Sequence, residues 1–112
     1  ISLIALADDS QAPGVFQAAA DLDLSVPRDL SILGFGNQDH RSASSLGLTT
    51  VEWPLKEMTE AAVSSIINVI EGRSPMTDVH PSASIDKEAP DGTPIATIPT
   101  RPVWRSSVAR RA

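Results

Sequence analysis

Residues 1–35 read ISLIALADDSQAPGVFQAAADLDLSVPRDLSILGF, and this stretch decides the fold class. Residues 1–7 and 30–35 are short runs of aliphatic side chains, typical of buried strands in a parallel sheet. Between them, Asp9 or Ser10 is expected to cap a helix that has Pro13 in its first turn. A strand, a helix and a second strand in so short a stretch predict a right-handed βαβ unit with parallel strands, and hence an α/β fold.

The strand ends indicate where a ligand would bind. In open parallel sheets, ligands bind beyond the carboxyl ends of the strands. Here the first strand is followed by Asp8 and Asp9, and the second by residues 36–39, GNQD. We therefore expect a ligand site between these two loops.

The remaining residues alternate between polar loops and apolar segments. Residues 40–47 are Ser-rich and are predicted to form a loop, and residues 48–51 a short strand. Residues 54–71 have apolar side chains at helical spacing on one face and predict the clearest helix of the chain. Residues 73–94, which contain four prolines, are expected to be a long loop. Residues 95–98 and 103–104 predict a final strand or strand pair.

Composition excludes several classes of protein. The chain has 112 residues and a net charge of −5, with 41% hydrophobic and 21% charged residues, which does not suit a fully disordered protein. No apolar run approaches the ~18 residues of a membrane span, so no membrane partner is expected. The absence of Cys excludes disulfides and thiolate metal sites. His40 and His80 lie at no metal-binding spacing, so no metal or cofactor is expected.

The charge distribution bears on nucleic-acid binding. All 14 acidic residues precede residue 92, whereas four of the nine basic residues follow it, at positions 101, 105, 110 and 111. The acidic balance argues against a nucleic-acid surface built from these residues. The basic tail is interpreted as a solvated terminus.

Four blocks of the sequence resemble the LacI/GalR family of bacterial transcription regulators. Residues 7–14, ADDSQAPG, are similar to its Asn-Asp-x-x-Ala-x-Gly segment, and residues 26–35, VPRDLSILGF, to its segment ending in Gly-Phe. Residues 48–58, LTTVEWPLKEM, resemble its LTTV-x-x-P-x-x-E-M segment. Residues 98–107, IPTRPVWRSS, resemble its closing segment. The blocks occur in the family's order and leave out residues 73–94.

The resemblance implies a periplasmic-binding-protein-like fold of type I, in which two α/β lobes are hinged around a ligand cleft, and identifies this chain as a C-terminal fragment of it. Residues 1–50 are then expected in the C-terminal lobe, and residues 51–72 in the hinge crossover and a helix of the N-terminal lobe. Residues 73–94 are expected to be a loop. Residues 95–112 would be the final strand of the C-terminal lobe and a basic tail.

The same resemblance implies a function. The chain is expected to be the effector-binding and dimerisation part of a cytoplasmic transcriptional regulator, such as a repressor. Operator DNA would be bound by a helix-turn-helix that is not in this chain. The implied effector is a small metabolite, a sugar or sugar acid.

The family's effector contacts suggest site residues. Asp8 stands where the family has an effector-binding Asn, and a carboxylate accepts strong hydrogen bonds from hydroxyls. Helix capping is the alternative for Asp8 and the favoured role for Asp9. Gly36 replaces a family Asp that binds sugar hydroxyls, so Asn37, or Gln38 and Asp39, are expected to take over.

Trp53 falls where several relatives have an effector contact. An indole ring packs well against the C–H face of a sugar, and a wedge at the hinge is the alternative role. We expect Asp8, Asn37 and Trp53 to bind the effector. The weaker candidates are Asp9, Gln38 and Glu52.

Two other functions compete with the regulator. A solute-binding protein of a sugar transport system would have the same fold but would need an export signal. An α/β enzyme would need a catalytic triad or a cofactor loop, and the serines at 42, 44 and 45 lack a nucleophile-elbow context, so no catalytic residue is expected. In so short a chain the apolar face of residues 54–71 would lack a partner, which predicts an association-prone product.

Overall fold

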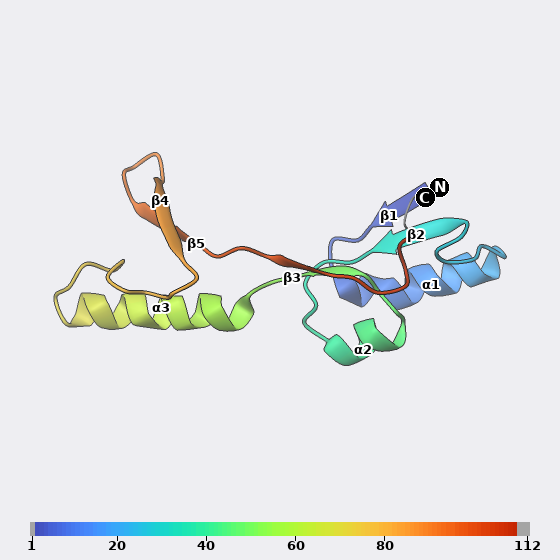
Figure 1. The fold of residues 1–112 in the computed structure, drawn as a ribbon, viewed down its shortest axis with the longest axis horizontal. Coiled ribbons are helices and arrows are strands. Elements are labelled where there is room, and N and C mark those ends of the chain that lie inside the picture. The colour runs from blue at the N-terminus through green and yellow to red at the C-terminus, as the bar shows by residue number, and fades with distance from the viewer. Residues whose placement is uncertain (1, 110–112) are drawn as a thin grey trace. The chain divides into compact units, whose positions relative to one another are not determined.

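The computed structural model describes residues 2–109, which form two compact units. The first unit extends to Trp53 and resumes at Arg101, and the second is Pro54–Thr100. The chain therefore passes between the units twice, directly after Trp53 and directly before Arg101. Figure 1 labels most of the helices and strands of both units.

The first unit begins with the predicted βαβ arrangement. Strands β1 and β2 pair in parallel, with Ser2 opposite Leu30 and Ala5 opposite Leu33, and α1 connects them. This confirms the predicted α/β class and strand direction. In chain order the elements of the unit are β1 (Ser2–Ala5), the 3₁₀ turn η1 (Asp9–Gln11), α1 (Ala12–Asp21), β2 (Leu30–Leu33), α2 (His40–Ser45), β3 (Thr50–Glu52) and β6 (Arg101–Val103).

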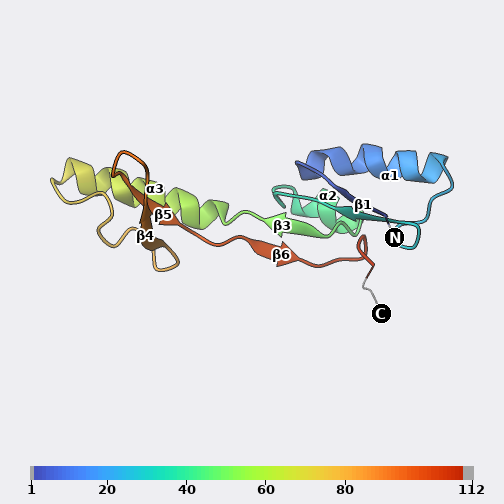
Figure 2. The same ribbon diagram turned by 90° about the horizontal axis from the view of Figure 1, so that it is seen from above.

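Strand β3 continues this arrangement on the other side of β2. Parallel bridges join Leu33 to Thr49 and Gly36 to Glu52. Strand β6 then pairs antiparallel with β3, and Figure 2 shows the two running side by side. Pro102 has no N–H to donate, which suits a short strand with a free edge.

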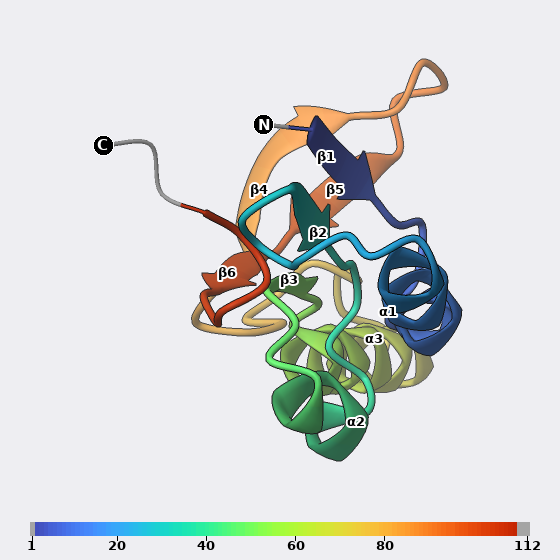
Figure 3. The ribbon, with the colours of Figure 1, turned by 90° about the vertical axis from the view of Figure 1, so that its right-hand side faces the viewer.

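The core of the first unit lies between β2 and its helices. Ile32 in β2 and Leu48 before β3 are fully buried. Ala12 and Ala19 of α1 and Ala43 of α2 pack into the same cluster, and Figure 3 shows both helices beside the strands. Small alanine side chains let the helices approach this cluster closely.

Strand β1 differs from expectation, because a buried strand was predicted. All four of its residues are exposed. The physical reason is that β1 pairs with β2 on one edge only, and no other strand of the described residues covers its second edge. The aliphatic side chains of β1 are therefore not buried by the other residues of the 2–109 range.

The second unit is built on α3 (Leu55–Ile70), followed by β4 (Ser84–Glu88) and β5 (Pro94–Thr97). The helix begins after Pro54 and ends before Gly72, which adopts a positive φ of 71°. Both boundaries agree with the predicted helix within a residue. Its buried positions are Ala61 and Asn68.

The apolar face of α3 is exposed, as expected for a helix without its partner. Leu55 is 49% and Ile66 61% exposed, and Met58, Val69 and Ile70 are also exposed. The covered side is instead the one that carries Ala61 and Asn68.

Across residues 2–109, none of the helices combines the length and hydropathy that crossing a membrane requires.

Two predicted loops contain regular structure. Within residues 40–47, His40–Ser45 form α2, because the Asp39 carboxylate accepts hydrogen bonds from the backbone N–H groups of Arg41 and Ser42 and so caps the helix. The long loop predicted for residues 73–94 is also wrong, since β4 lies within it and forms a hairpin with β5. The hairpin turns at Asp91 and Gly92, where Gly92 has a φ of 82°.

Candidate functional site

The carboxyl ends of β1 and β2 lie together, as parallel strands require. The Leu6 N–H donates to the Leu33 carbonyl at 2.8 Å, and the Asp9 N–H to the Phe35 carbonyl at 3.0 Å. These bonds place the loop after β1 against the loop after β2. The two loops that were predicted to flank a ligand site therefore adjoin each other at this edge of the strands.

Asp9 is the anchor of this edge. Its Oδ2 accepts from the Asn37 N–H at 2.7 Å, and its Oδ1 accepts from the Thr50 hydroxyl at 2.7 Å. The expected capping role is wrong for Asp9, because α1 begins after Gln11 without a side-chain cap. One carboxylate therefore ties together the ends of three strands.

Gly34 makes room for that anchor. A Cβ at position 34 would lie 2.1 Å from Oδ1 of Asp9 and 2.8 Å from Cδ2 of Leu48. The Gly of the Gly-Phe pair is thus required by close packing at the strand end. Gly34 does not have a positive φ, so its backbone conformation does not require glycine. The lack of room for a side chain does.

Asn37 is buried and engaged by its own chain. It is 4% exposed, and its Nδ2 donates to Oε1 of Glu52 at 3.0 Å. Its Oδ1 accepts from the Arg105 guanidinium at 3.2 Å. Through these hydrogen bonds, Asn37 links the end of β2 to β3 and to the C-terminal segment.

Glu52, Arg101 and Arg105 extend this hydrogen-bond network. Glu52 also accepts from Arg101 at 2.5 Å, across the β3–β6 pair. The Arg105 guanidinium donates to the Leu48 carbonyl at 2.6 Å. Sequence reasoning interpreted Arg101 and Arg105 only as parts of a basic tail. Arg110 and Arg111 lie outside the described residues.

Asp8 is exposed at the rim of the strand ends. Its Oδ1 accepts from the Ser10 N–H at 2.8 Å and caps η1, so the capping alternative is realised for Asp8. Hydrogen bonding from the Ser10 side chain, and then from its backbone, lowers the pKa of the Asp8 carboxyl below its ordinary value. Asp8 therefore carries a full negative charge near neutral pH.

Trp53 packs against the end of β2. Its ring meets Phe35 edge to face, with centroids 5.6 Å apart, and it is 41% exposed. The backbone N–H of Trp53 donates to the Gly36 carbonyl at 3.3 Å. One side of the indole is thus fixed by Phe35, while a large part of the ring stays accessible.

A cavity of about 320 Å³ opens at these strand ends. Of the six candidate residues, Asp8, Asp9 and Gln38 line it, whereas Asn37, Glu52 and Trp53 are not among its lining residues. Helix α2 contributes the part of the wall that the sequence did not predict. The lining residues are Asp8, Asp9, Ser10, Phe35, Gln38, Asp39, Ser42 and Ala43.

Asp39 combines two roles in that wall. Its Oδ2 accepts from the Ser42 hydroxyl at 2.5 Å, and its Oδ1 accepts from the Ser42 N–H at 3.3 Å. These bonds lower the pKa of the Asp39 carboxyl, so this cap is also a second negative charge at the cavity. An Asp directly before a helical segment is a preferred N-cap, and this is the signal that could have predicted it.

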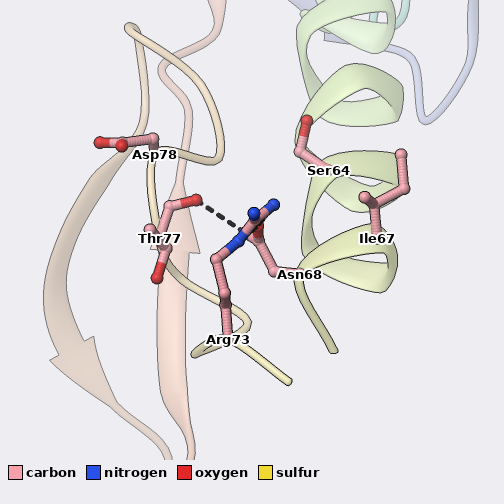
Figure 4. A pocket seen from close by; sticks show the side chains of 6 residues that line it. All are labelled: Ser64, Ile67, Asn68, Arg73, Thr77 and Asp78. Carbon is pink, nitrogen blue, oxygen red and sulfur yellow. Dashed lines mark hydrogen bonds between the residues drawn. The ribbon is translucent and has the colours of Figure 1, made fainter. Parts of the chain in front are cut away.

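The second unit has a cavity of its own, of about 400 Å³, shown in Figure 4. Asn68 of α3 donates to the Thr77 carbonyl at 2.7 Å and accepts from Arg73 at 2.8 Å, and these partners line the cavity with Ser64, Ile67 and Asp78. The polar groups are thus engaged in holding the loop after α3 to the helix. Among residues 2–109, no group of His, Asp and Glu side chains is placed to hold a metal ion.

Comparison with known proteins agrees with this geometry. Residues 2–108 match the family of periplasmic binding protein-like domains. The HTH-type transcriptional regulator MalR of Clostridium butyricum is 39% identical over 70 residues, which are 62% of this chain and 21% of MalR. The chain thus spans about a fifth of the length of this regulator.

Solved structures show the same fold. The dimeric Lac repressor with an 11-residue C-terminal deletion is 17% identical with a TM-score of 0.69, over 96% of this chain and 33% of the repressor. A LacI-family transcriptional regulator from Enterococcus faecalis V583 with bound ribose is 22% identical with a TM-score of 0.65, over 96% of this chain and 34% of that one. The expected periplasmic-binding-protein-like fold and the resemblance to LacI-family regulators are both confirmed.

Proposed function

Because the chain belongs to the family of periplasmic binding protein-like domains, we propose that it is part of the effector-binding region of a bacterial transcriptional regulator. The observation that carries the proposal is the cavity at the carboxyl ends of β1 and β2, within a chain whose relatives are LacI-family regulators. In open parallel sheets this edge is where ligands bind. The regulator as a whole would act on DNA, and so in the cytoplasm.

The effector we propose is a sugar or a related polyhydroxylated metabolite. Carboxylate and amide oxygens at Asp8 and Gln38 can accept hydrogen bonds from ligand hydroxyls, and Phe35 gives the cavity an apolar wall. The ribose-bound relative from Enterococcus faecalis supports this class. Asn37 and Glu52 do not line the cavity and Asp9 does, but the polar groups of all three bond within the chain, so we assign them to supporting the site.

Trp53 remains in the proposal as an effector contact from outside the cavity wall. Its accessible ring offers a flat apolar surface to the C–H face of a sugar. Contact with an effector would then require the ligand to extend beyond the lining residues, over the Phe35–Trp53 pair.

The proposed mechanism is a shift between two conformations. An effector that binds one arrangement of the effector region better than another shifts the population toward it. In a homodimer, as in the dimeric Lac repressor, that shift would change the affinity of the DNA-binding regions for an operator. No catalytic step is part of this proposal, and relatives that are transcriptional regulators do not favour the solute-binding alternative.

The test uses the full-length protein that contains this chain. Operator sequences are selected from a random DNA library, and their binding is then measured with and without each member of a panel of neutral sugars. We expect a specific DNA sequence to be enriched, and at least one sugar to change its affinity and to bind in calorimetry. Failure to enrich any sequence would overturn the regulator, and binding of no sugar would overturn the effector class.

A further inference from the structure

The cavity at the strand ends is strongly acidic. Three of its eight lining residues are carboxylates, Asp8, Asp9 and Asp39, and none of the eight is basic. The hydrogen bonds that surround Asp8 and Asp39 hold both pKa values below the ordinary range for Asp. A ligand in this cavity therefore meets several fixed negative charges at neutral pH.

The three carboxylates are not equivalent. Asp9 uses one oxygen for Thr50 and the other for Asn37. Asp39 uses both oxygens to cap α2. Both therefore contribute charge to the cavity while their hydrogen-bonding capacity serves the fold.

Asp8 is the carboxylate that remains available. It is exposed, and its Oδ1 accepts from the Ser10 N–H. The Ser10 side chain is the other described group that hydrogen-bonds to it, so among residues 2–109 this exposed carboxylate is engaged by Ser10 alone and can still accept from a ligand. An ionised carboxylate only accepts hydrogen bonds, so its partner must be a donor, and a charged donor forms the stronger bond.

The other walls limit what can carry that donor. Phe35 and Ala43 are apolar, and Gln38 and Ser42 are short neutral polar groups. About 320 Å³ suits a ligand of the size of a monosaccharide. Such a ligand needs a C–H face for Phe35 and donor groups for Asp8.

We propose that this cavity selects effectors without negative charge, and that Asp8 makes it prefer a protonated amine to a hydroxyl, as in an amino sugar or an aminated polyol. The inference rests on the proposed function and narrows its effector class, because sugar acids and sugar phosphates are disfavoured. The charge at Asp8 is thus the feature that would determine this specificity.

Matched sugars test the inference in the full-length protein. Calorimetry at pH 7 and constant ionic strength compares glucose, glucosamine and glucuronate, and then the three galactose counterparts. Within a binding series we expect the amine to bind about tenfold more tightly than the neutral sugar, and the acid at least about tenfold more weakly. An acid that binds as tightly as the neutral sugar overturns the inference and leaves the proposed function standing.

The variant Asp8→Asn removes the charge and keeps an oxygen for the Ser10 N–H. The ratio of amine to neutral-sugar affinity should then fall toward one. The matched control Asp86→Asn removes an exposed carboxylate in β4 and should leave all ratios unchanged. An unchanged amine preference in Asp8→Asn also overturns the inference, whereas a protein that selects DNA and binds no sugar in either series overturns the effector class itself.

Discussion

At the scale of single residues, the hydroxyl of Ser107 connects the C-terminal segment to two neighbouring strand segments. It is 1% exposed, donates to the Ile32 carbonyl at 2.6 Å and accepts from the Thr49 N–H at 2.7 Å. Ser107→Ala would leave both backbone groups buried without this partner. We expect the free energy of unfolding to fall by about 1–3 kcal/mol.

Urea unfolding followed by tryptophan fluorescence measures this loss. The matched control is Ser106→Ala, because Ser106 is exposed and its hydroxyl lies 3.4 Å from the Gly47 carbonyl. That variant should stay within about 0.5 kcal/mol of the parent. Equal losses in the two variants would show that the Ser107 hydroxyl does not hold the strands together.

A second prediction concerns Gly34. Gly34→Ala would drive a Cβ into the Asp9 carboxylate and Leu48, so the bonds from Asp9 to Thr50 and Asn37 must shift. We expect a loss of about 1–3 kcal/mol, as for other overpacked sites. The control Gly14→Ala has no atom within 4 Å of the new Cβ and lies in α1, so it should be neutral or stabilising by up to about 1 kcal/mol.

These residues also show how far the sequence could predict the site. Parallel strands and their polar ends place Asp8, Asp9 and Asn37 in one region, because that follows from the βαβ pattern alone. Their individual roles depend on partners far along the chain, such as Thr50 for Asp9 and Arg105 for Asn37. No local pattern indicates which polar side chain such a partner will engage.

At the scale of elements, α3 presents a large apolar face to solvent. Leu55, Ile66 and Ile70 are all exposed, and Ile70 is the most exposed of the three. Burial of such surface contributes about 25 cal/mol per Å², so contact between copies is favourable. We expect the 112-residue chain to self-associate at micromolar concentrations in sedimentation velocity.

A charged side chain on that face should reverse the self-association. Ile66→Lys places a charge at the centre of the exposed stripe and should shift the sedimentation coefficient toward the monomer value. Ala20→Lys, at an exposed position of α1 that carries a small side chain, is the matched control and should sediment like the parent. A parent chain that remains monomeric at all concentrations would contradict the prediction.

The elements that the sequence predicted best are those with the strongest periodicity. The helix α3 follows from its repeated apolar positions and from Pro54 and Gly72 at its ends. The short helix α2 and the β4–β5 hairpin were missed because each depends on a local hydrogen bond that a carboxylate accepts, Asp39 from the Ser42 N–H and Asp91 from the Thr93 N–H. The polar composition of residues 40–47 and the prolines of residues 73–94 favoured loops over those cap and turn signals.

At the scale of the whole molecule, the two units differ in how many of their carboxyl groups have a lowered pKa. The carboxyl pKa is lowered for Asp8, Asp29 and Asp39 in the first unit and for Asp91 in the second. In each case the largest cause is a side-chain hydrogen bond, from Ser10, Arg28, Ser42 and Thr93 respectively. More of this carboxylate stabilisation therefore lies in the first unit.

Acid should accordingly destabilise the first unit. A carboxyl whose pKa is lower in the folded state than its ordinary 3.8 stabilises the fold above that value, and the contribution is lost as pH falls through the folded pKa. Trp53 and Trp104 both belong to the first unit, so their fluorescence reports its unfolding by urea. Between pH 7 and pH 5 these groups should leave the urea midpoint unchanged, and below about pH 4 the midpoint should fall.

In Asp29→Asn, which removes the carboxylate partner of Arg28 and of the Ser25 N–H, the fall below pH 4 should be shallower. The control Asp86→Asn in the second unit should retain the parent slope. A fluorescence midpoint that stays constant down to pH 3, or falls equally in Asp29→Asn, would show that these hydrogen-bonded carboxylates do not set the acid stability.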